Sequence, residues 1–118
     1  MDLTNTAGIA LDSATDDLAD VQASAAELVA ASAPASEWSS FTVRLAAAEG
    51  SVAAWSKLVQ VMARVEGNGS EVSSALVTSV ALSLMSAGAD DSWSGRGNDV
   101  QRARFDGVRA ACQQMSFL

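Results

Sequence analysis

The sequence predicts an all-α fold, a four-helix bundle of two long and two shorter helices, in a single domain over residues 1–118. Two long runs of apolar residues alternate spacings of three and four, which is the helical period. Strand signals are nearly absent, because the chain has no tyrosine and most of its β-branched residues lie inside the helical patterns.

Each long helix is marked by apolar positions on one stripe. The first run is Leu11, Ala14, Leu18, Val21, Ala25 and Leu28. The second run is Trp38, Phe41, Leu45, Ala48, Val52, Trp55, Val59 and Met62. We expect the first helix to start near Thr4 or Thr6 and reach Ala31. We expect the second to start at Ser36 as its N-cap and to reach Glu66, with Gly50 causing at most a bend.

The two shorter helices are predicted from turn and cap residues. The turn at residues 67–69 (Gly-Asn-Gly) precedes Ser70, which would cap a third helix that ends near Ala87, before Gly88. Residues 90–97 would form a loop, and Asn98 would cap the fourth helix. The apolar face of that helix is predicted to contain Val100, Phe105, Val108, Cys112 and Met115.

Composition favours a protein that associates with itself or with another helical protein. The stripes are rich in alanine, so each contact buries little area, and oligomerisation would add the missing stability. Fourteen acidic residues against seven basic ones give a net charge of −7, which argues against nucleic-acid binding. Residues 1–43 carry no Lys or Arg, whereas the last 23 residues hold four arginines. Either these charges pair within the chain, or acidic and basic ends meet between subunits.

No membrane span or secretory signal is expected. Residues 72–89 carry no charge, but six Ser and Thr residues make this stretch too polar for a stable insertion. A buried helix explains it better. The first residues lack a basic segment followed by an apolar one, so we expect no Sec signal peptide.

Candidates for catalysis are few, and we expect no enzyme, cofactor or metal site. The chain has no histidine, and Cys112 falls on an apolar helical face, where a structural thiol is expected. An alternative function is a small-ligand or anion-binding module, in which the backbone amides of residues 95–97 lie before a helix and Arg96 lies nearby.

Trp93 stands out because a large indole in a polar loop needs a groove to fill, either in this chain or in a partner. The sequence Trp93-Ser94-Gly95, followed by a helix, resembles the WXG-type helical-hairpin proteins of the ESX (type VII) secretion system. That resemblance implies a helical hairpin, dimer formation and a role as a secretion partner. The predicted interface residues are Trp93, Gly95, Arg96, Arg102, Arg104 and Phe105.

Two origins therefore remain open within one class, a non-enzymatic helical interaction protein that forms a homo-oligomer or packs on a helical partner. The first is a WXG-like secretion partner. The second is a small structural or host-modulating phage protein, because the bias toward Ala, Ser, Asp and Arg is similar to that of actinobacteria and their phages. The expected location is accordingly the cytoplasm, a virion or the outside of the cell after ESX export.

Overall fold

The computed structural model of the chain is all-helical in the part that it describes and has four helices there, which confirms the all-α prediction. It describes the backbone of residues 2–94 and 99–118 and the side chains of residues 2–87 and 99–118. The helices are α1 (Leu3–Ala30), α2 (Ala35–Gly67), α3 (Ser74–Ser94) and α4 (Asp99–Met115). The predicted fourth-helix cap, Asn98, lies outside the described residues.

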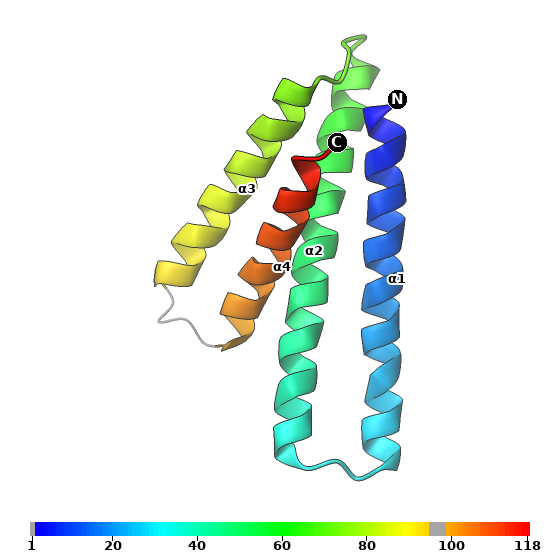
Figure 1. Cartoon of the computed structure of the whole chain (residues 1–118), viewed down its shortest axis with the longest axis vertical. Helices are drawn as coiled ribbons and strands as arrows, with labels where there is room; N and C mark the ends of the chain where they lie inside the picture. The colour runs from blue at the N-terminus through cyan, green and yellow to red at the C-terminus, as the bar shows by residue number, and fades with distance from the viewer. Residues whose placement is uncertain (1, 95–98) are drawn as a thin grey trace.

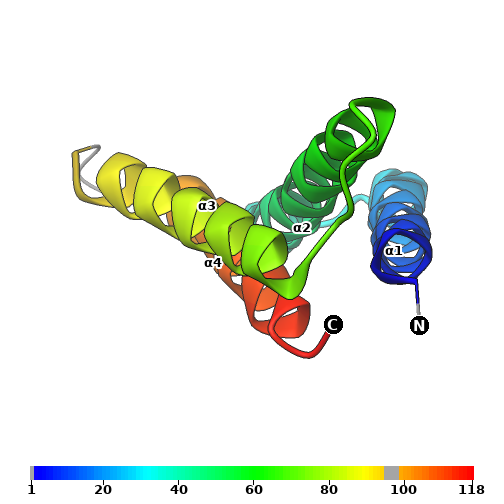
Figure 2. The same ribbon diagram turned by 90° about the horizontal axis from the view of Figure 1, so that it is seen from above.

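The helices form two hairpins that meet through α2 and α4. α1 packs along α2, α3 packs along α4, and the most extensive packing joins α2 to α4 (Figures 1 and 2). The molecule measures 53 × 31 × 22 Å, and its radius of gyration is 16.1 Å. A compact chain of this length would have a radius of gyration of about 13.5 Å. The arrangement is therefore elongated, with α1 and α3 on opposite sides of the α2–α4 pair.

The starts of the long helices differ slightly from the predicted ones. The carboxylate of Asp2 accepts a hydrogen bond from the Thr4 backbone N–H at 3.0 Å, so Asp2 is the N-cap and α1 begins before either predicted threonine. The prediction of Ser36 as the second N-cap is wrong. Pro34 has an extended backbone (φ −69°, ψ 164°), and its carbonyl accepts from the backbone N–H of Glu37, so α2 begins before Ser36.

The third helix is shifted toward the C-terminus of its predicted range. Ser70 lies in the turn, and the Ser73 hydroxyl instead accepts the early helical N–H of Leu76 at 3.2 Å. The predicted stop at Gly88 is also wrong, because α3 continues to Ser94. Residues 90–94 of the predicted loop are therefore helical, and its remaining residues, 95–97, lie outside the described residues. A glycine ends a helix when it adopts a positive φ, which Gly69 does at +80° and Gly88 does not.

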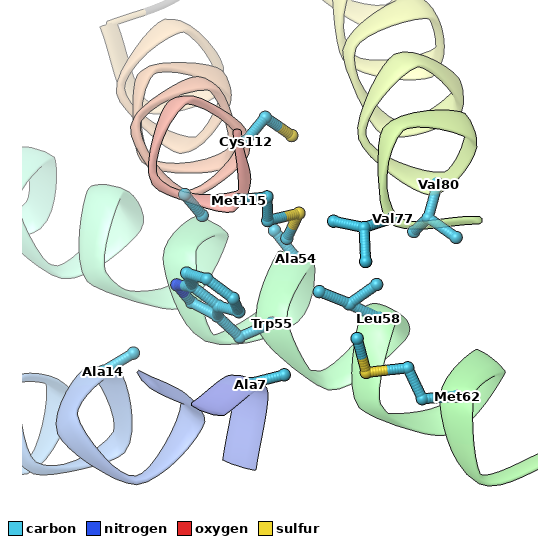
Figure 3. Packing of buried hydrophobic residues seen from close by; sticks show 11 residues of the cluster. Ala7, Ala14, Ala54, Trp55, Leu58, Met62, Val77, Val80, Cys112 and Met115 are labelled. Atoms are coloured by element: carbon cyan, nitrogen blue, oxygen red, sulfur yellow. The ribbon is translucent and has the colours of Figure 1, made fainter. Parts of the chain in front are cut away.

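The core lies along the part of α2 that the other three helices approach. Its largest fully buried side chains are Trp55, Leu58, Met62 and Met115. Figure 3 shows the Trp55 indole between the α1 alanines Ala7 and Ala14 and the side of α4 that carries Met115. Trp55 is one of the apolar positions that the sequence analysis placed on a single stripe of the second helix, and it is 2% exposed.

A second stripe of α2, which the spacing of large residues did not reveal, packs on α4. Small residues recur at every fourth position: Ala46, Gly50 and Ala54 in α2, and Ala103, Gly107 and Ala111 in α4. All six are buried. Small side chains allow two helical backbones to approach closely. The predicted apolar face of the fourth helix is therefore only partly right, because Val100, Phe105 and Val108 are merely half-buried.

Candidate interaction surface

An apolar groove runs between α3 and α4 on the outside of their hairpin. Its volume is about 320 Å³. The apolar lining residues are Val77, Ala81, Leu82 and Met85 from α3 and Cys112 and Met115 from α4. Val77, Cys112 and Met115 are buried and form its floor, whereas Leu82 is 65% exposed and forms part of its rim. Helical spacing of three and four places the α3 residues on one face, which α4 covers only in part.

The polar residues of the groove surround this apolar floor. They are Thr78 from α3, Arg109 and Gln113 from α4, and Ser116 from the turn that follows α4. Arg109 is already engaged within its own helix, because its guanidinium lies 2.9 Å from the Asp106 carboxylate and 5.9 Å from the centre of the Phe105 ring. The groove is thus an apolar surface with one cation at its edge, and that cation has a neighbouring anion.

A large exposed aromatic side chain lies just beyond the groove in sequence. Phe117 follows the groove residue Ser116 and is 88% exposed. Its backbone is held by turn hydrogen bonds, because the N–H of Phe117 donates to the Gln114 carbonyl at 3.0 Å and the N–H of Leu118 donates to the Met115 carbonyl at 3.2 Å. The Phe117 ring is therefore exposed on a turn whose backbone is hydrogen-bonded, and aromatic residues are enriched at protein–protein interfaces.

The sequence-predicted interface residues do not gather at this groove. The side chain of Trp93 and all of Gly95 and Arg96 lie outside the described residues; the Trp93 backbone belongs to the last turn of α3. Arg102 is exposed near the start of α4 and lines a separate shallow hollow beside α2. Phe105 is half-buried beneath Arg109.

Arg104, also predicted to lie at the interface, faces α2 instead. Its guanidinium lies 3.8 Å from the Glu49 carboxylate, and both side chains are about half exposed. Together with the Arg109–Asp106 pair, this contact shows that two arginines of α4 have acidic neighbours within the chain. The α4 charges are thus partly compensated inside the molecule.

The acidic charge is concentrated on α1. This helix and its N-cap carry six acidic residues and no basic one: Asp2, Asp12, Asp16, Asp17, Asp20 and Glu27. Asp12, Asp16 and Asp20 are exposed and four residues apart, so they repel one another along one side of the helix. α4, in contrast, carries three arginines and two aspartates. The acidic surface and the groove therefore lie on different hairpins.

Cys112 is the thiol of the groove, and burial raises its pKa by desolvating the charged form. Its Sγ lies 3.6 Å from the Ala81 carbonyl oxygen, across the helix pair. The neutral thiol thus acts as a weak hydrogen-bond donor from α4 to α3. Among the described residues no three His, Cys, Asp or Glu side chains are grouped so that they could hold a metal ion.

The sequence analysis placed Cys112 and Met115 on an apolar helical face but did not predict the groove, because its residues have no chemical signature. The available signals were Leu82, an apolar residue among the serines and threonines of residues 72–89, and Phe117 near the end of the sequence. The prediction that residues 72–89 form a buried helix is wrong, because Val77 and Val80 are the only buried side chains of α3 in its described part, which packs on its neighbours along one side. None of the helices in the described part combines the length and the apolarity needed to cross a bilayer.

No known family model matches the sequence. Neither the curated proteins nor the solved structures contain a significant match.

Proposed function

We propose that this chain is a non-enzymatic protein–protein interaction protein, which associates with itself or packs against a helical partner. The observation that carries the proposal is the α3–α4 groove, an apolar surface bordered by the exposed side chain of Leu82. Exposed apolar surfaces of this kind are typical of contact sites in soluble proteins. The absence of histidine from the sequence and the raised thiol pKa of Cys112 add support, because both disfavour nucleophilic or acid–base catalysis near pH 7.

A helical partner fits this surface better than an extended one. The groove lies between two helices, and the ridges of a third helix can fill the space between them. No sheet edge is present in the described part of the chain to bind a strand. A closed four-helix bundle is accordingly proposed for the assembled state, in which helices from a second chain cover the open side of the α3–α4 hairpin.

Within this class, a WXG-like secretion partner is supported by the position of the motif. Trp93 and Ser94 end α3, α4 begins at Asp99, and the two helices pack on each other. The first two residues of the motif therefore end one of two helices that pack on each other, which agrees with the hairpin that the resemblance implies. A small phage structural or host-modulating protein is the alternative, supported by composition alone. Neighbouring genes separate the two, since secretion ATPase genes favour the first and capsid or tail genes the second.

The direct test is sedimentation velocity of the full chain over a wide range of protein concentration. We expect association in the micromolar range, either with itself or, in a titration, with a helical protein encoded beside it. Trp93→Ala should weaken the complex without unfolding the chain if Trp93 belongs to the interface. A chain that stays monomeric and binds no neighbouring product would contradict the proposal.

A further inference from the structure

We infer that the occupant of the α3–α4 groove is a second copy of this chain, so that the two α3–α4 hairpins face each other across a two-fold axis. The inference rests on the proposed function and deepens it, because it names the partner and the surface. The surface consists of the groove residues Leu82, Met85 and Cys112 together with the exposed ring of Phe117. Three independent features of the chain support it.

The first feature is the area that the single chain leaves exposed. Its accessible surface is 7208 Å² at a mass of 12.1 kDa. A compact monomer of that mass exposes only about 6,000 Å². The excess is of order 1,000 Å², and a standard protein–protein interface buries roughly 800 Å² on each partner. One interface of ordinary size would therefore bring the area per chain close to that of a compact protein.

The second feature is the distribution of charge. Two copies with a net charge of −7 repel each other, and six of the acidic residues lie on α1 and its N-cap. Residues 72–89, which supply the α3 side of the groove, carry no charge, and α4 carries more arginines than aspartates. Two identical chains therefore repel each other less across the α3–α4 face than across the acidic surface of α1.

The third feature is that an exposed aromatic side chain directly follows a residue of the groove in sequence. A two-fold interface requires one surface to carry both the pocket and the group that fills a pocket. Ser116 lines the groove, and the next residue, Phe117, is 88% exposed on a hydrogen-bonded turn. In the dimer each Phe117 ring enters the other copy's groove, which has a volume of about 320 Å³. Burial of such a ring removes roughly 150–250 Å² from water in each copy.

The test compares Leu82→Asp with Val29→Asp in the full chain. The two side chains are almost equally exposed, at 65% and 67%, but Val29 lies on α1, away from the groove. Both variants add the same single negative charge. Sedimentation velocity should show a wild-type dimer and a Val29→Asp dimer, whereas Leu82→Asp should raise the dimer dissociation constant by more than roughly 100-fold, because the carboxylate appears twice in a desolvated interface. Phe117→Ala, which changes a side chain outside the core, should raise it by roughly tenfold or more.

The outcomes separate this inference from the proposed function. If Val29→Asp weakens the dimer as much as Leu82→Asp does, the contact lies elsewhere, so the inference fails although self-association stands. If the wild-type chain is monomeric at millimolar concentration, the inference also fails, and the proposed function then depends on a different partner. Thermal unfolding followed by circular dichroism checks that each variant is folded.

The salt dependence of the dimer dissociation constant gives a second test. Added salt should lower this constant, because it screens the repulsion between like-charged chains that meet through an apolar contact. A constant that rises with salt would indicate an ionic interface and would overturn the inference.

Discussion

Gly50 of α2 and Gly107 of α4 form one close crossing, in which each glycine makes room for the backbone of the opposite helix. A Cβ atom at Gly50 would collide with the Arg104 carbonyl, and a Cβ atom at Gly107 would collide with the Ala47 carbonyl. Both glycines are buried and helical. The crossing joins the two hairpins, so the relative position of α1–α2 and α3–α4 depends on the absence of two side chains.

Gly50→Ala should destabilise the protein even though alanine is the better helix former. The methyl group would displace α4, and overpacking of this kind costs about 1–3 kcal/mol. Gly8→Ala is the matched control, because Gly8 lies inside α1 with no atom within 4 Å of its would-be Cβ. That change should stabilise the chain by roughly 0.5–1 kcal/mol. Urea unfolding measures the free energy of unfolding of both variants. Equal changes in the two variants would mean that α2 and α4 can move apart at Gly50 without loss of stability.

Trp55→Ala should lower the free energy of unfolding by about 3–5 kcal/mol, because the indole is 2% exposed and contacts the core shared by several helices. Trp38 is a useful control of the same residue type. It is half-buried in α2, and its ring lies 5.8 Å from that of Phe41 in an edge-on arrangement. Trp38→Ala should cost less than Trp55→Ala. A larger loss of thermal stability in Trp38→Ala than in Trp55→Ala would place the core nearer the start of α2.

Arg104→Gln should change stability by less than about 1 kcal/mol, because the ion pair with Glu49 is 3.8 Å long and both side chains are about half exposed. The small effect should shrink further at high salt. Urea unfolding at low and high ionic strength measures both quantities. A loss well above 1 kcal/mol, insensitive to salt, would show that Arg104 stabilises the α2–α4 crossing in some way other than by this ion pair.

The Cys112 thiol should make stability fall at alkaline pH. Its pKa is raised in the folded chain by burial, so folding favours the protonated thiol. The stabilisation is present in full below the pKa of an unfolded thiol and is lost as pH rises through the higher folded-state pKa. The chain has no tyrosine to titrate in the same range. Urea unfolding at increasing pH should show this loss in the native chain, and Cys112→Ala should show a shallower one.

The apolar spacing in the sequence determined that the chain is helical, where the two long helices lie and that Trp55 is buried. Helix formation depends on contacts three or four residues apart, which a sequence displays directly, and the resulting apolar stripe marks Trp55 as a side chain to be covered by another helix. The turn with Gly69 was predicted for the same reason, since a positive φ there is a local requirement. Gly88 carries the same local signal, yet the helix continues through it, so one glycine does not by itself end a helix.

Only the tertiary structure decided which helices meet and which surface stays open. Considered from the sequence alone, Gly50 and Gly107 only lower the helix propensity of their segments. In the structure they are the positions at which the backbones of α2 and α4 come into contact. The groove at Leu82 depends on how far α4 covers α3, which no residue specifies alone. Helix formation is a local property, whereas packing depends on side-chain volumes on both sides of a contact, and those sides are more than 50 residues apart in the sequence at Gly50 and Arg104.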